Sequence, residues 1–248
     1  MTVPLHTSPV EIVAHRGYAA LFPENTMIAF RRALDMGADA LEIDVHHSAE
    51  GVPVVIHDDT LDRTTDRSGP VRSKSVGELQ QADAGIKFHP DYAGSGIPLL
   101  EEVLALLSEG RAGLQLELKE HIHEQEAAGL LHLLDTYKLT ERTMIISFHV
   151  DNLQLIRSLH PAIEVGWLSD KLVDLDILTG LGHAALLLQY RAVLNHPDIV
   201  ATAREKGFSL AAWTIRDEAD ARKLYNLGVR RITTDIPLKG VLPDTASE

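Results

Sequence analysis

The chain has 248 residues, 45% of them hydrophobic, which is enough for one sizeable core and predicts a single catalytic domain over residues 1–248. A formal net charge of −13 argues against nucleic acid or an anionic membrane as partner, so local cations or a metal ion must meet any phosphate. The chain has no cysteine, which excludes disulfides, thiolate metal sites and a cysteine nucleophile.

The amino-terminal segment Met1–Glu11 has neither a basic region nor an apolar stretch typical of a signal peptide. The longest apolar run, Ala184–Leu188, is far too short to span a bilayer. We therefore predict a cytoplasmic location and no stable membrane association, although a leader removed before this start would leave no trace. The sequence leaves homo-oligomer formation open.

Short apolar segments alternate with longer segments of helical period. The predicted strands are Glu11–His15, Ala40–Val45, Gly113–Lys119, Thr143–Phe148, Glu164–Leu168, Ala184–Gln189, Ser209–Ile215 and Arg231–Asp235. The predicted helices are Asn25–Met36, Leu99–Leu107, Glu124–Tyr137, Asp151–Leu159, Pro197–Lys206 and Asp217–Leu227. Nearly continuous apolar strands are typical of a parallel sheet covered on both faces.

Repeated strand–helix alternation indicates an α/β protein, and eight repeats favour closure into a (β/α)8 TIM barrel. The main alternative is an open doubly wound sheet. That fold usually carries a glycine-rich phosphate loop after its first strand, and this sequence has none there.

One segment interrupts the alternation. After Val45, a second extended run, Val52–His57, follows too soon for a crossover helix, so we predict a β-hairpin that turns near Glu50 and Gly51 and extends strand 2. Pairing outward from that turn places His57 roughly opposite Asp44. Residues 58–98 are predicted to form a small insertion on the catalytic face, with one short helix near Val76–Asp83.

Carboxylates are expected to converge at the carboxyl ends of the barrel strands, where such folds keep their chemistry. Glu42 and Asp44 are two residues apart and point to the same side of their strand, where Glu117 of the next barrel strand can face them. Three converging carboxylates cannot all stay ionised without a cation. Oxygen ligands suit one divalent metal ion, Mg²⁺ or Ca²⁺, with Mn²⁺ also acceptable.

Two histidines and two cations end strands beside these carboxylates. His15 and His57 could act as general acid and general base at a metal site. Arg16 and Lys119 could contact phosphate oxygens and stabilise a pentavalent transition state, or they could neutralise the carboxylates, and both roles can hold at once.

Several short motifs follow one another along nearly the whole chain. The first two blocks, the most specific ones, are His15-Arg16-Gly17 with Pro23-Glu24-Asn25-Thr26, and Glu42-Ile43-Asp44-Val45 with Pro53-Val54-Val55-Ile56-His57-Asp58. Further motifs are Leu61-Asp62-Arg63-Thr64-Thr65, Leu116-Glu117-Leu118-Lys119, Ser147-Phe148, Trp213-Thr214 and Thr234-Asp235. In this order they resemble the glycerophosphodiester phosphodiesterase family, most closely its short bacterial type.

The resemblance implies a (β/α)8 barrel that releases glycerol 3-phosphate and an alcohol such as choline or ethanolamine. It also implies roles for individual residues: metal binding by Glu42, Asp44 and Glu117, acid and base work by His15 and His57, phosphate contacts by Arg16 and Lys119, and a glycerol or leaving-group pocket lined by Trp213.

The motif around Glu24 and Asn25 has a structural reading beside a catalytic one. Asn25 or Thr26 could cap the first helix, and Glu24 could brace His15 or Arg16 from behind.

No serine or cysteine nucleophile with a paired base is evident, so we expect no covalent enzyme intermediate. Attack by the glycerol 2-hydroxyl through a cyclic phosphate is our first hypothesis, and direct attack by water is the simpler one. Two other functions stay open: a phospholipase D- or C-like or lysophospholipid phosphodiesterase on the same barrel, and a non-catalytic barrel that only binds a phosphorylated ligand.

Overall fold

The structure, a computed structural model, describes residues 9–243. The strands of this part of the chain are β1 (Glu11–His15), β2 (Ala40–His47), β3 (Pro53–Val55), β4 (Gly113–Leu118), β5 (Thr143–Ser147), β6 (Glu164–Ser169), β7 (Ala184–Gln189), β8 (Ser209–Ile215) and β9 (Arg231–Thr234). The α-helices are α1 (Met27–Asp35), α2 (Val76–Gln80), α3 (Leu100–Ser108), α4 (Glu124–Thr136), α5 (Val150–Leu159), α6 (Asp176–Thr179), α7 (Tyr190–Asn195), α8 (Asp198–Glu205) and α9 (Glu218–Leu227). Three single 3₁₀ turns are η1 (Val71–Ser73), η2 (Pro90–Tyr92) and η3 (Thr140–Arg142).

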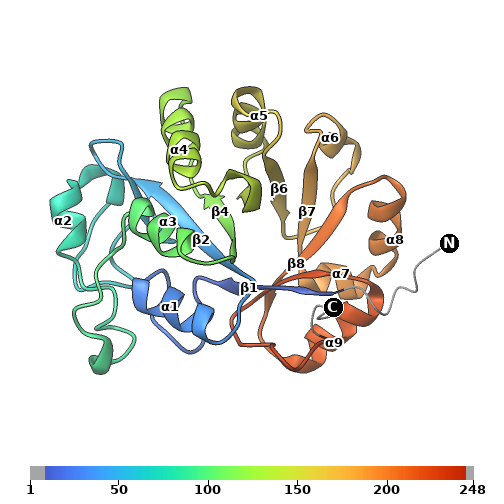
Figure 1. Cartoon of the computed structure of the whole chain (residues 1–248), viewed down its shortest axis with the longest axis horizontal. Coiled ribbons are helices and arrows are strands. Elements are labelled where there is room, and N and C mark those ends of the chain that lie inside the picture. Colours follow the sequence, from blue (N-terminus) through green and yellow to red (C-terminus); the bar gives the residue numbers. More distant parts are fainter. Residues whose placement is uncertain (1–8, 244–248) are drawn as a thin grey trace.

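These strands form one closed barrel. Their order is β1-β9-β8-β7-β6-β5-β4-β2-β3, and a parallel β1–β2 pairing closes the ring of eight parallel strands, with β3 added antiparallel to β2. Helices surround the strands on the outside (Figure 1). The predicted (β/α)8 TIM barrel is thus confirmed, and the open doubly wound sheet is wrong.

Most predicted element ends lie within two residues of the observed ones. The largest difference along the barrel strands is in β2, which runs two residues further, to His47, because β3 pairs with this extension. Helices α6 and α7, of four and six residues, were not predicted.

The hairpin after β2 is present, but its register differs from the prediction by one residue. Val45 pairs with Val55, so Ile56 rather than His57 lies opposite Asp44, and the Ile56 amide donates to the Asp44 carbonyl at 3.0 Å. The reason is the turn, where the Ser48 amide donates to the Val52 carbonyl and three residues rather than two lie between them. The last of the three, Gly51, has a positive φ of 77°, which suits glycine.

Residues 58–98 pack on their own small hydrophobic cluster. Its buried members are Val54, Ile56, Leu61, Val71, Leu79, Ala82, Ala84 and Ile97, apart from the main core between barrel and helices. The predicted short helix is α2, which is capped by Ser75 and Glu78 in a reciprocal capping box. The interpretation of this segment as an insertion within one domain stays a prediction.

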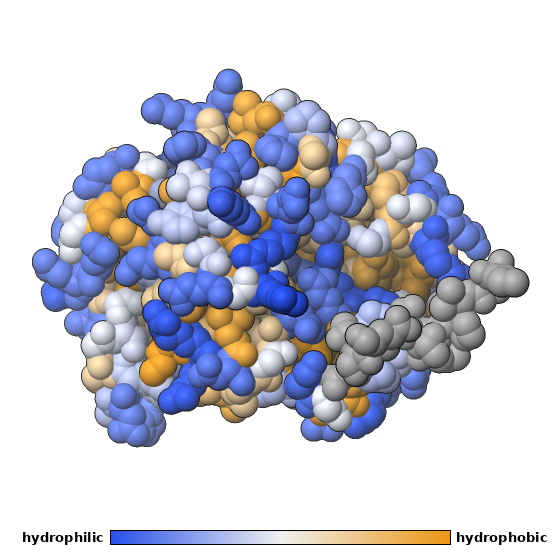
Figure 2. Space-filling view, in the orientation of Figure 1, coloured by the Kyte–Doolittle hydropathy of each residue, from blue (hydrophilic) through white to orange (hydrophobic). Residues whose placement is uncertain are grey.

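Within residues 9–243, no helix combines the length and the apolar character that crossing a membrane requires. On the face shown in Figure 2, hydrophilic residues dominate and hydrophobic ones gather in separate patches. Most of Met1–Glu11, on which the predicted cytoplasmic location depends, lies outside the described residues, so that location stays a prediction.

Candidate active site

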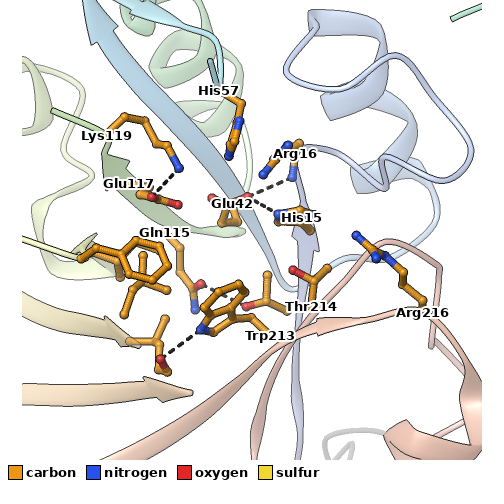
Figure 3. A pocket seen from close by; sticks show the side chains of 15 residues that line it. His15, Arg16, Glu42, His57, Gln115, Glu117, Lys119, Trp213, Thr214 and Arg216 are labelled. Carbon is orange, nitrogen blue, oxygen red and sulfur yellow. Dashed lines mark hydrogen bonds and ion pairs between the residues drawn. The ribbon is translucent and has the colours of Figure 1, made fainter. Parts of the chain in front are cut away.

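The strand register brings the predicted polar residues to one end of the barrel. His15 of β1 is paired with Glu42 of β2, and Asp44 of β2 is paired with Glu117 of β4. Because side chains alternate along a strand, these four and Lys119 turn to the same, inner side of the barrel, where all but Asp44 line a cavity. Figure 3 shows a charged group gathered on one side of this cavity, with Trp213 on the other; the group consists of His15, Arg16, Glu42, His57, Glu117 and Lys119.

The three carboxylates lie close together and buried. One oxygen from each of Glu42, Asp44 and Glu117 lies within 4.8 Å of the others, and the residues are 2%, 0% and 7% exposed. Burial and the neighbouring Asp44 and Glu117 raise the pKa of Glu42 well above its ordinary value. Burial and Asp44 raise the pKa of Glu117 to about 7. Burial acts to raise the pKa of Asp44 as well, but the cations Arg16 and Lys119 outweigh it and hold this pKa below its ordinary value.

This carboxylate triad fits a hard divalent cation. Within the described part of the chain, Oδ1 of Asp44 is buried and accepts no hydrogen bond, although the Lys119 ammonium lies 3.5 Å away. Crowded carboxylates, two of them with raised pKa values, and a buried oxygen that accepts no hydrogen bond are what a cation would relieve. The donor set therefore agrees with the predicted metal site, without identifying the ion.

Arg16 and Lys119 hold the carboxylates from two sides. Nε of Arg16 lies 3.0 Å from Oδ2 of Asp44, and the Lys119 ammonium lies 2.6 Å from Oε1 of Glu117. Both side chains also line the cavity, so charge neutralisation and contact with a phosphate are compatible. The backbone at Arg16 has a positive φ of 49°, and the following Gly17 cannot carry a side chain because a Cβ would lie 2.7 Å from the Ala29 Cβ.

His15 is oriented by a carboxylate at the end of β9. Its Nδ1 lies 2.5 Å from Oδ1 of Asp235, and Oδ2 of Asp235 accepts from Nε of Arg216 at 2.7 Å. Burial would raise the pKa of Asp235, but His15 and Arg216 outweigh it and lower that pKa. An ionised Asp235 accepts the Nδ1 proton, so this hydrogen-bond arrangement assigns the free Nε2 of His15 to the cavity, 4.0 Å from Glu42.

His57 is oriented by a second, longer chain of ion pairs. Its Nδ1 lies 2.6 Å from Oδ1 of Asp58, whose Oδ2 accepts from Arg63 at 2.7 Å. Arg63 also donates to Glu24 at 2.8 Å, and Glu24 accepts a second hydrogen bond from Arg16 at 3.0 Å. Glu24 therefore braces Arg16 directly and reaches His57 only through its neighbours.

Burial sets the electrostatics of His57. Together with the cations Arg16 and Lys119, burial lowers the pKa of His57, although Asp44 acts against this. A lowered pKa keeps the imidazole neutral near pH 7, which suits a proton acceptor.

Asn25 and Thr26 have separate local roles. Asn25 donates from Nδ2 to Oδ2 of Asp44 at 2.7 Å, which fixes one carboxylate of the triad. Thr26 is the residue that caps α1, where its hydroxyl accepts from the Ala29 amide at 3.3 Å.

The opposite side of the cavity is mostly apolar. The cavity has a volume of about 230 Å³, and its apolar lining comes from Ile146, Phe148, Leu168, Leu187 and Trp213. Trp213 is fixed by an indole N–H that donates to the Leu187 carbonyl at 3.0 Å, and its ring meets Phe148 edge to face at 5.5 Å between centroids. These contacts make Trp213 a rigid wall of the cavity.

Several polar neighbours of the cavity were not assigned roles from the sequence, Asp235, Gln115 and Thr233 among them. Asp235 ends a strand in a weak motif, and only the folded barrel shows that it contacts His15. Gln115 and Thr233 line the floor of the cavity. Each lies two residues before a polar residue of the site, Glu117 or Asp235, and side chains two apart on a strand point to the same side, so this spacing could have indicated them. Ser147 is also a polar residue at a strand end, but its hydroxyl donates to the Leu118 carbonyl at 2.8 Å and so supports the end of β4.

Comparisons with known proteins agree with this site. The profile of the glycerophosphoryl diester phosphodiesterase family matches residues 15–239. A glycerophosphodiester phosphodiesterase of Caldanaerobacter subterraneus is 34% identical over 91% of this chain and 94% of its own length.

Two solved structures are similar throughout. A phosphodiesterase of Oleispira antarctica, in complex with its product sn-glycerol-3-phosphate, superposes with a TM-score of 0.86 at 32% identity, covering 92% of this chain and 94% of the other. A glycerophosphodiester phosphodiesterase of Agrobacterium tumefaciens gives a TM-score of 0.79 at 33% identity, covering 92% and 97%.

Proposed function

Since this chain belongs to the glycerophosphoryl diester phosphodiesterase family, we propose that it is an enzyme that hydrolyses glycerophosphodiesters with the help of a divalent metal ion. The products would be sn-glycerol 3-phosphate and an alcohol such as choline or ethanolamine. The observation that carries the proposal is the buried triad of Glu42, Asp44 and Glu117 beside His15 and His57. The product held by the related Oleispira enzyme supports the same substrate class.

The charges of the cavity suit a phosphodiester once a divalent cation is bound. Three ionised carboxylates against Arg16 and Lys119 leave one net negative charge when the histidines are neutral. A divalent cation on the triad would turn this into one net positive charge, the complement of a phosphodiester. Mg²⁺ or Ca²⁺ suits these oxygen ligands, and Mn²⁺ is acceptable. Such an ion supplies Lewis-acid stabilisation of phosphate oxygens.

In the proposed reaction, His15 and His57 share the proton transfers. One accepts the proton of the glycerol 2-hydroxyl as its oxygen bonds to phosphorus, and the other protonates the leaving alcohol as its P–O bond breaks. Water then opens the cyclic phosphate with the two roles reversed. Arg16 and Lys119 stabilise the negative charge that builds up on the phosphate oxygens.

Direct attack by water on phosphorus is the alternative route to the same products. A diester that lacks the 2-hydroxyl separates the two routes, because only the cyclic route needs that group. We expect turnover of this analogue to be lost, and unchanged turnover would exclude the cyclic phosphate.

The test of the function is release of glycerol 3-phosphate from glycerophosphocholine. We expect no release with EDTA, restored release with added Mg²⁺, Ca²⁺ or Mn²⁺, and loss again in Glu42→Ala and His15→Ala variants that remain folded by circular dichroism. No release with any metal from the folded wild type would overturn the proposal. A lysophospholipid or phospholipid should then be assayed, together with co-sedimentation on liposomes.

A further inference from the structure

The floor of the cavity contains a buried amide whose donor has no partner. Gln115 is 2% exposed and lines the cavity at the level of Glu42, below Glu117. Its Oε1 accepts from the hydroxyl of Thr233 at 3.2 Å, across the barrel interior from β4 to β9. Its Nε2 is buried and finds no hydrogen-bond acceptor among the described residues. Because Thr233 holds the oxygen, Nε2 is the atom of the amide left for a ligand to meet, and Figure 3 shows Gln115 beside Trp213 in the lining of the cavity.

An amide in this state is costly unless something in the cavity accepts its hydrogen bond. Leaving a buried donor unsatisfied costs about 1–3 kcal/mol, so natural proteins rarely keep one without a use. The neighbouring walls, Ile146 and Leu187, are apolar and offer no side-chain acceptor. An acceptor brought by the substrate would satisfy the amide.

The position of Gln115 relates it to the reacting groups. Gln115 is paired with Glu42 in the sheet, and Glu42 is paired with His15, so these three residues lie at one level of the barrel. Glu117 and Lys119 stand two and four residues further along the strand, toward the rim. Gln115 is therefore one pleat deeper than the carboxylates and cations nearest the rim.

We propose that Gln115 binds the terminal hydroxyl of the glycerol moiety and makes the enzyme selective for glycerol diesters. This inference rests on the proposed function, in which the 2-hydroxyl faces the histidines and the other hydroxyl is left without a role. A hydroxyl oxygen can accept the free N–H of Gln115. The closed floor suits the glycerol moiety, which every substrate shares, whereas the variable alcohol lies toward the rim near the exposed Phe148 and Arg216.

The experiment compares two choline diesters, one of glycerol 3-phosphate and one of 1,2-propanediol 1-phosphate, which lacks only the terminal hydroxyl. We expect the wild type to prefer the glycerol diester in kcat/KM by about tenfold or more, because a site built to bond a hydroxyl rejects the analogue without it. Gln115→Met keeps the side-chain length and removes the amide. It should lose about that factor on the glycerol diester and stay within about twofold on the propanediol diester.

The ratio of the two rates is measured within each variant, so a partial loss of folded protein cancels. Gln189→Met makes the same change at the end of β7, outside the residues that line the cavity, and should keep the wild-type preference. A wild type without preference, or a Gln115→Met variant that keeps it or loses both substrates equally, would overturn the inference. If the wild type hydrolyses neither diester, the proposed function fails instead.

Discussion

The two halves of the barrel mouth are built differently. On the side of β1, β2 and β4, nearly every side chain is tied to another by an ion pair or a hydrogen bond, and two chains of contacts end at His15 and His57. On the side of β5 to β8, the lining is mostly apolar, and the Trp213 indole donates to a backbone carbonyl. The charged half is suited to chemistry, and the apolar half is suited to shaping what enters.

The two halves also differ in what a substitution should disturb. In the charged half, removing one group leaves buried partners unsatisfied, and the effect spreads along the chain of ion pairs. In the apolar half, a substitution changes mainly the area and shape of the wall. Turnover should therefore depend on the first half and substrate affinity on the second.

The largest contrast is expected from His57→Gln. Loss of a general acid or base lowers kcat by about 10²–10⁴-fold. Phe148→Leu, the control in the apolar half, should change kcat by less than about threefold, since it removes only an edge-to-face contact. Steady-state kinetics on glycerophosphocholine measures both. Equal losses in the two variants would show that the division into halves is wrong.

A smaller effect is expected from Asp235→Asn, which keeps the shape but removes the charge behind His15. We expect kcat to fall on the order of 10–100-fold with KM little changed, because the wrong tautomer of His15 becomes available. Arg216→Gln is the control, since Arg216 also contacts Asp235 but its side chain is 73% exposed. Arg216→Gln should lower kcat by less than about threefold. If Arg216→Gln is as damaging as Asp235→Asn, the charge of Asp235 is not what orients His15.

The sequence predicts the charged half better than the apolar half, for a physical reason. Glu42, Asp44 and Glu117 stand at fixed spacing on strands, and strand geometry alone turns them to one side. Their partners come from remote positions: Asp235 is 220 residues from His15, and no local pattern connects the two. A contact between distant strand ends becomes visible only when the barrel closes.

The limits of the sequence are clearest where local detail decides the geometry. The one-residue error in the hairpin register came from a turn with three residues where two were expected, and composition does not distinguish them. In the sequence, Gln115 does not differ from other strand residues, and only the folded structure shows that its amide nitrogen is buried without an acceptor among the described residues. The apolar wall of Leu168 and Leu187 likewise cannot be told from ordinary core residues by sequence.

The apolar half should affect affinity more than turnover. We expect Trp213→Ala to raise KM by about tenfold, because a rigid aromatic wall is lost, while kcat changes less. Trp213→Phe keeps much of the aromatic surface and gives up the hydrogen bond to the Leu187 carbonyl, so its KM should lie between those of Trp213→Ala and the wild type. A large fall in kcat at unchanged KM would instead place Trp213 among the groups that act in the transition state.

The smallest effect concerns stability, and it has the opposite sign from activity. In metal-free protein the pKa of Glu117 is raised to about 7. The folded protein therefore loses stability as pH rises from about 4.3, the ordinary pKa of a glutamate, through about 7, because ionising Glu117 is harder in the folded state than in the unfolded chain. Glu117→Gln removes this cost but also weakens the contact with Lys119. We expect a net gain of about 1 kcal/mol in the free energy of unfolding at pH 8 with EDTA, and none at pH 4.

The matched control for this stability prediction is Glu120→Gln. Burial would raise the pKa of Glu120, but His46, His47 and Arg72 outweigh it and lower that pKa, so its ionised form stabilises the fold. The same substitution should therefore destabilise the protein at pH 8, and the difference should shrink as pH falls below about 4.3. Denaturant unfolding at both pH values measures the two variants. A stabilised Glu120→Gln, or a destabilised Glu117→Gln in metal-free protein, would contradict the view that only the triad is strained without its cation.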